Sequence, residues 1–75
     1  MLNKLKEILA KVNKTIDMNR VTEDTRLIDD LGLDSLSIML FAMEIEAAFG
    51  FRFNEPVRFE TVGEVCAYLV EKGLD

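Results

Sequence analysis

Residues 31–50, LGLDSLSIMLFAMEIEAAFG, contain the clearest helix signal in the sequence. Asp34 is a residue type that caps helix N-termini, because its side chain accepts hydrogen bonds from the first free backbone N–H groups. The following stretch is rich in apolar residues and has no helix breaker until Gly50, a common helix stop. We therefore predict a helix over residues 35–49.

The chain before this helix divides into an amphipathic segment and a loop. Apolar residues recur at steps of three and four in residues 2–14, which predicts a helix with its lysines facing water. Between Thr15 and Asp34 this period fades, and acids and turn-forming residues surround scattered apolar residues. We expect a long loop that is held to the core by those apolar side chains.

The chain after Gly50 predicts one more main helix. Thr61 and Glu64 have the spacing of a capping box, which opens a helix over residues 61–72. A short helical turn is expected near residues 55–59, whereas residues 49–53, FGFRF, are too short and unpartnered to form a strand. The predicted fold is all-α: a small antiparallel bundle of three main helices and one short helix with a long first loop.

Length and charge restrict the function. The 75 residues are enough for a single domain over residues 1–75, too small to enclose a sizeable catalytic cavity, and 49% of them are hydrophobic. The net charge of -5 disfavours nucleic acid and anionic lipid and favours partners that present Lys or Arg. No apolar run is long enough for membrane insertion. We expect a cytoplasmic monomer that binds no nucleic acid.

The residue types present exclude several kinds of catalysis and metal binding. The chain has no His, so the imidazole-activated nucleophiles of hydrolases are absent. The acids Asp29, Asp30 and Asp34 lack the spacing of a calcium loop, and helix capping and solvation are the favoured interpretation. Cys66 lies on an apolar stripe of the last helix, as a small core residue does. We predict no enzyme activity, no catalytic residue and no metal site.

Ser35 is the position with the most specific chemical interest. It follows a Gly turn and begins a helix, so its hydroxyl is expected at an exposed corner beside free N–H groups and the positive end of the helix dipole. A phosphodiester is well placed there. Taken alone, Asp34 and Ser35 are better explained as residues that only cap the helix. The whole of residues 25–36, TRLIDDLGLDSL, resembles the acyl carrier protein family, in which an acidic loop with Asp-Leu-Gly leads into Asp-Ser-Leu.

The resemblance implies roles for the matching residues. Ser35 would receive 4'-phosphopantetheine from coenzyme A through a separate phosphopantetheinyl transferase, and Asp34 would support that transfer. The arm would carry acyl groups as thioesters between acyl-loading and acyl-processing enzymes, for fatty-acid, lipid or polyketide-type biosynthesis. Leu36 would contact those partners. The residues expected to line a pocket for the acyl chain are Phe41, Ala42, Ile45 and Phe49.

The helix over residues 35–49 has a second apolar stripe on the side away from the core-facing one. Its members, taken as a partner-binding face together with Glu46, are Leu36, Met39, Leu40, Met43 and Ala47. The common family pattern has a row of acids on this helix where this chain has Ser37, Leu40, Ala47 and Ala48, and of that row only Glu46 clearly remains. We interpret the depleted acidic face as that of a specialised carrier with a dedicated enzyme set.

Two other functions fit the same residues. An aminoacyl or peptidyl carrier uses the same arm with different cargo, and the residues around Ser35 do not separate it from an acyl carrier. A helical interaction module that is never modified is the other alternative, for which the Asp-Ser-Leu segment is a coincidence.

Overall fold

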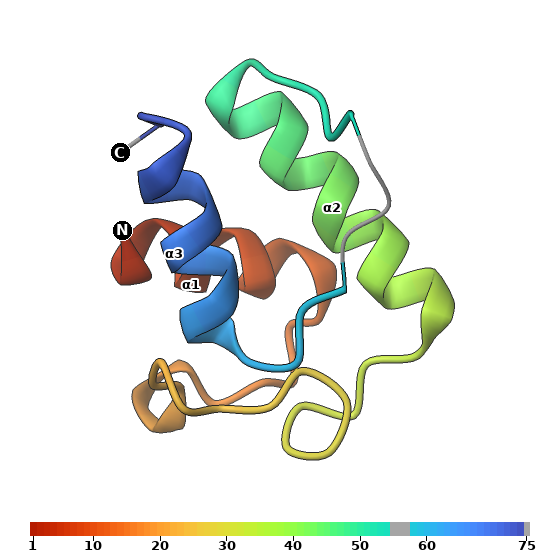
Figure 1. Cartoon of the computed structure of the whole chain (residues 1–75). Helices are drawn as coiled ribbons and strands as arrows, with labels where there is room; N and C mark the ends of the chain where they lie inside the picture. The colour runs from red at the N-terminus through yellow and green to blue at the C-terminus, as the bar shows by residue number, and fades with distance from the viewer. Residues whose placement is uncertain (55–57, 75) are drawn as a thin grey trace.

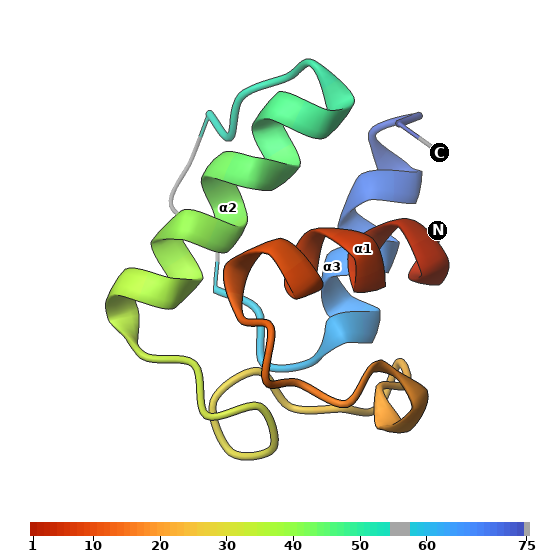
Figure 2. The ribbon, with the colours of Figure 1, turned by 180° about the vertical axis from the view of Figure 1, so that it is seen from behind.

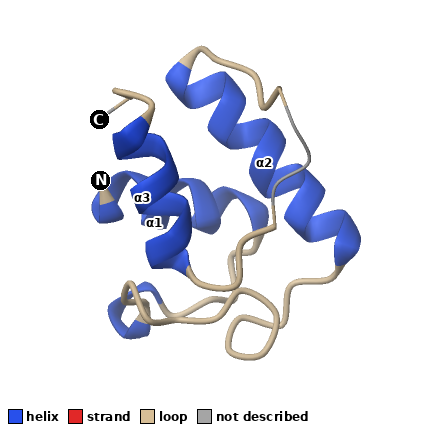
Figure 3. Cartoon of the chain, in the orientation of Figure 1, coloured by secondary structure: helices blue, strands red, loops and turns tan. Residues whose placement is uncertain are grey.

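The computed structural model describes residues 1–54 and 58–74. Its elements are the helices α1 (Leu2–Val12), α2 (Ser35–Phe49) and α3 (Val62–Glu71) and a short 3-10 helix, η1 (Met18–Arg20). The described part of the chain consists of helices joined by loops, as Figure 3 shows. The described residues contain no strand, only one isolated bridge between Arg26 and Thr61. The predicted all-α fold is confirmed.

Helix α1 packs against both α2 and α3 and crosses them (Figures 1 and 2). The described residues between α2 and α3, 50–54 and 58–61, are called the return segment: the first stretch leaves the end of α2, and the second leads into α3 on the side of the molecule where α2 begins (Figure 1). As a result α2 and α3 run in the same direction, so the predicted antiparallel order does not extend to this pair. This return segment later forms one wall of the site.

The core draws on all three helices and on the loop between α1 and α2. Helix α1 contributes Leu5, Ile8 and Leu9 from a single face, as its amphipathic period predicts. The loop adds side chains that are almost fully buried, which confirms the prediction that it is held to the core. The buried apolar residues are Leu5, Ile8, Leu9, Val21, Leu27, Leu33, Phe41, Ile45, Val62, Val65, Cys66 and Leu69.

Helix α1 ends at Val12, two residues before the predicted end. Asn13 has an extended backbone, with φ -147° and ψ 107°. Its side-chain oxygen accepts hydrogen bonds from the Thr15 amide at 3.0 Å and from the Thr15 hydroxyl at 2.6 Å. Asn side chains favour such local turns over a continued helix, which explains the early stop. The 3-10 helix that follows was not predicted.

Backbone hydrogen bonds fasten the loop before α2 to the segment before α3. The Leu27 amide donates to the Glu60 carbonyl at 2.9 Å, and the Val62 amide donates to the Thr25 carbonyl at 2.9 Å. Two long-range bonds so close together fix the position of the chain that leads into α2. The start of α2 is therefore held by the tertiary fold and not only by its own helix.

The beginning of α3 has the predicted cap. The Thr61 hydroxyl accepts from the Glu64 amide at 3.2 Å, and α3 covers Val62–Glu71 within the predicted range of 61–72. The predicted short turn near residues 55–59 lies mainly outside the described residues. Arg58 and Phe59, which are described, are not helical.

Candidate functional site

Ser35 is exposed at the first residue of α2. The turn before it uses Gly32 with φ 68°, a left-handed conformation that suits glycine. Leu33 is 2% exposed and anchors the chain in the core. Asp34 then caps the helix, and its Oδ1 accepts from the Ser37 amide at 2.8 Å. The buried Leu33 side chain and the Asp34 cap thus fix the backbone on either side of the helix start, and Ser35 is exposed to solvent there.

The electrostatics of this helix start favour an anion. The hydrogen bond from the Ser37 amide lowers the pKa of Asp34, so its carboxylate is ionised at neutral pH. No acidic residue occupies the first turn of α2. The first-turn N–H groups that the cap does not use still point out of the helix end, and the helix dipole adds partial positive charge there.

Asp29 and Asp30 have local partners in the loop before α2. Arg26 forms an ion pair with Asp29 at 3.3 Å, and its amide donates to Asp30 Oδ2 at 2.8 Å. These bonds, with the Asp34 cap, are the capping and solvated roles predicted for the three acids. Among the described residues no group of three or more His, Cys, Asp or Glu side chains is placed to hold a metal ion.

A largely apolar cavity of about 390 Å³ opens beside Ser35. This is within the size range of small-molecule pockets, roughly 300–1,000 Å³. Its walls come from α2, from the loop before α2 and from the return segment after it. The lining residues are Leu27, Ile28, Ser35, Ile38, Phe41, Ala42, Ile45, Phe53, Arg58 and Phe59.

Three of the four residues expected to line an acyl pocket, Phe41, Ala42 and Ile45, line this cavity. Phe49, the fourth, is not among the residues that line this cavity. It lies about 21 Å along the helix axis from the first residue of α2, packs against the core, and has the Lys4 ammonium 5.8 Å from its ring centroid. Helical periodicity places Phe49 on the core-facing side of α2, but the cavity does not extend along the helix as far as Phe49.

The second apolar stripe of α2 is exposed to solvent. Relative exposure is 59% for Leu36, 54% for Met39, 42% for Leu40 and 56% for Met43. Ala47 is also exposed. The side chains predicted as a partner-binding face are thus available for contact, and none of these four belongs to the core.

Glu46 differs from the rest of that predicted face. It is half-buried, and its Oε2 accepts a hydrogen bond from the Phe53 amide at 2.8 Å. The carboxylate therefore fastens the return segment to the end of α2. Periodicity along α2 gave no signal for this role, because the partner lies outside the helix.

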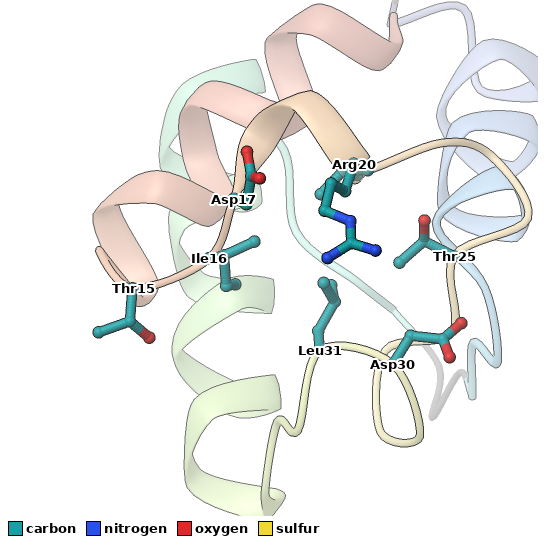
Figure 4. A pocket seen from close by; sticks show the side chains of 8 residues that line it. Thr15, Ile16, Asp17, Arg20, Thr25, Asp30 and Leu31 are labelled. Carbon is teal, nitrogen blue, oxygen red and sulfur yellow. The ribbon is translucent and has the colours of Figure 1, made fainter.

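A second cavity, of about 540 Å³, lies between η1 and the loop before α2. Figure 4 shows the guanidinium of Arg20 pointing into the space between Ile16, Thr25 and Leu31. This cavity shares no lining residue with the one beside Ser35. Its wall includes side chains of both charges, so it is not a continuation of the apolar cavity.

The fold and the site together define a small helical carrier domain: one exposed serine at a capped helix start, next to a cavity that can hold an apolar group. Comparison with known proteins agrees. Residues 3–69 match the family described as a phosphopantetheine attachment site. None of the helices in the described part of the chain is long and apolar enough to cross a membrane.

Several acyl carrier proteins are similar to this chain over nearly its whole length. The one from Thermotoga maritima is 34% identical over 74 residues, which cover 96% of this chain and 90% of the relative. One from Clostridium perfringens is 37% identical over 73 residues, 95% of each chain. Acyl carrier protein MbtL of Mycobacterium bovis is 40% identical over 62 residues, 80% of this chain and 74% of the relative. The chain belongs to the acyl carrier protein family, whose members are carriers and not catalysts.

Proposed function

We propose that Ser35 is the residue that bears the 4'-phosphopantetheine arm, and that the protein carries acyl intermediates of fatty-acid, lipid or polyketide-type biosynthesis. The supporting observation is the exposure of Ser35 at a capped helix start that borders an apolar cavity. Ser37, the other serine of the chain, is half-buried, and its amide is bound to Asp34. The names of the relatives favour acyl over aminoacyl cargo.

The residues around Ser35 fit such an arm. Free N–H groups at the start of α2 can bind the oxygens of a phosphodiester, as helix N-termini commonly do. The bound arm supplies a thiol that carries acyl groups as thioesters. Asp34 directly precedes Ser35 in the chain and its carboxylate is ionised, and we assign it a supporting role in the transfer.

Intact mass measurement tests the attachment. The protein is incubated with coenzyme A and a broad-specificity phosphopantetheinyl transferase, and a gain of one phosphopantetheine group is expected. Ser35→Ala should abolish the gain without loss of helical circular dichroism. Ser37→Ala is the matched control and should still be modified. Modification that survives in Ser35→Ala and disappears in Ser37→Ala would contradict the assignment.

The exposed stripe of α2 is proposed as the contact surface for partner enzymes, with Leu36, Met39, Leu40 and Met43 at its centre. Apolar and methionine side chains bind through surface burial, so we expect weaker salt dependence than for a row of ion pairs. Partners that present a complementary apolar surface would form a dedicated enzyme set for acyl loading and processing. Ala47 lies at the margin of this surface, and Glu46 contributes less because its carboxylate is already bound.

Leu40→Glu tests this surface by adding an acid where the common family pattern has one. The variant should keep its fold, because a surface substitution changes stability by about 0.5 kcal/mol or less. It should be accepted better by general fatty-acid synthesis enzymes than the unmodified sequence. Val70→Glu, at an exposed apolar residue of α3, is the control for added charge alone. Equal acceptance of all three proteins would refute the specialisation.

A further inference from the structure

Among the described residues that line the cavity beside Ser35, Arg58 has the only charged side chain. The other lining residues, apart from Ser35 itself, are apolar. A guanidinium on an apolar wall is unfavourable unless it meets water or an anion, because charge is costly to remove from water without a partner. Arg58 is exposed, so its side chain is at the edge of the cavity and not at its base.

Hydrogen bonds on either side of Arg58 attach the described parts of the return segment to α2 and to the loop before α2. Near the end of α2, the Phe53 amide is bound to the Glu46 carboxylate. The Glu60 carbonyl, two residues after Arg58, accepts from Leu27 in the loop that leads into α2. Phe53 is thus held beside Glu46 in the last turn of α2, whereas Arg58 is two residues away from a contact with the loop that leads into α2.

The Arg58 guanidinium has no carboxylate partner in the described part of the chain. The ion pair found among residues 1–54 and 58–74 is the one between Arg26 and Asp29. An arginine head group offers five N–H donors in a planar arrangement that matches phosphate and carboxylate oxygens. An unpaired arginine at the mouth of a cavity in a protein of net charge -5 thus provides a local site for one anion.

We propose that Arg58 binds the phosphodiester of the arm on Ser35 and so holds the arm over the mouth of the cavity. The inference rests on the proposed attachment at Ser35. Covalent attachment would fix one phosphodiester beside a cavity that both residues line, so the pairing is intramolecular and benefits from a high effective concentration. Arg58 acts as a positioning residue: it biases a loaded chain toward the apolar cavity and away from solvent.

Phosphorus NMR of the loaded protein tests the contact directly. The holo protein is compared with holo Arg58→Gln and with holo Arg52→Gln, which removes an exposed arginine of the same segment that does not line this cavity. Arg58→Gln should move the phosphodiester resonance and remove its dependence on salt, whereas Arg52→Gln should leave both unchanged. Arg58→Lys keeps the charge and should retain part of the effect.

Thioester cleavage by hydroxylamine gives a second measurement. With a saturated acyl cargo, Arg58→Gln should be cleaved about two- to fivefold faster than the unmodified sequence, the size expected from one exposed ion pair. An unchanged phosphorus resonance in fully loaded Arg58→Gln would overturn the proposal. So would a change in cleavage confined to cargo with a terminal carboxylate, which would assign Arg58 to the cargo. Failure of Ser35 to gain mass would instead defeat the proposed function, and this assignment with it.

Discussion

Substituting Leu for Ala42 should have opposite effects on the empty and the loaded protein. Ala42 is half-buried in the middle of α2 and lines the cavity beside Ser35. A larger apolar side chain at this position fills part of the space that the acyl chain needs. The empty protein should become more stable, and the stabilisation that an acyl chain adds should decrease.

The expected size follows from the carbons that are added. Leu has three more carbons than Ala, and burial contributes about 0.8 kcal/mol per methylene, or about 2.4 kcal/mol for complete burial. The cavity is open on one side, so about half of this, roughly 1 kcal/mol, is expected for the empty protein. That raises the midpoint of thermal unfolding by about 4–8 °C for a domain of this size. The acyl-induced stabilisation should fall by about 1–2 kcal/mol, since the same carbons are displaced from the cavity.

Ala48→Leu is the matched control, because Ala48 is exposed on the same helix and does not line the cavity. Denaturant unfolding of the apo and acyl forms of each protein gives both quantities. Ala42→Leu should narrow the difference between the two forms, and Ala48→Leu should not. The reasoning is refuted if Ala42→Leu leaves the acyl-induced stabilisation unchanged, because the acyl chain then lies elsewhere.

Three further predictions concern stability and reactivity. Gly63→Ala in α3, which helix propensity alone favours, should destabilise by about 1–3 kcal/mol in denaturant unfolding, because the new Cβ would lie 2.8 Å from the Glu23 carbonyl oxygen; a gain in stability contradicts this. The Ser37 amide lowers the pKa of Asp34, so the cap stabilises the fold above the ordinary value of 3.8 and this contribution is lost as pH falls through the lowered pKa. The stability difference between the unmodified sequence and Asp34→Ala should therefore shrink in acid, and a constant difference would count against it. Cys66 is buried and burial raises the pKa of its thiol, so native protein should react slowly with a bulky thiol reagent, and rapid labelling would argue for an accessible site.

Helix α2 was predictable to the residue because both of its ends are set by neighbouring residues. Asp34 caps the start, and Gly50 ends the helix in the left-handed conformation with φ 67°. The exposed serine at the helix start follows from the same local signals. Helix α1 was predicted two residues too long, because its end depends on the side chain of a single residue, Asn13, which favours a turn.

The outer wall of the cavity was not predictable, because it depends on contacts between segments far apart in sequence. Phe53 and Phe59 belong to the return segment, whose position is fixed by hydrogen bonds to α2 and to the loop before α2. Their rings, 6.3 Å apart between centroids, both pack on Tyr68 of α3. The short alternation FGFRF, which includes Phe53, gives no indication that this residue lines a cavity.

Glu46 also has a contact outside its own helix that the sequence does not indicate, and this contact changes the interpretation of the partner-binding face. On the sequence it was the one acid that clearly remained of the family's acidic row, and it was predicted to bind partners. In the fold its carboxylate accepts the Phe53 amide, and an ionised acceptor of this kind contributes about 1.5–3 kcal/mol. A partner that recruited Glu46 would have to break this bond or share the carboxylate. The apolar side chains of the exposed stripe carry no such cost, which supports recognition through Met39 and Met43 over recognition through the remaining acid.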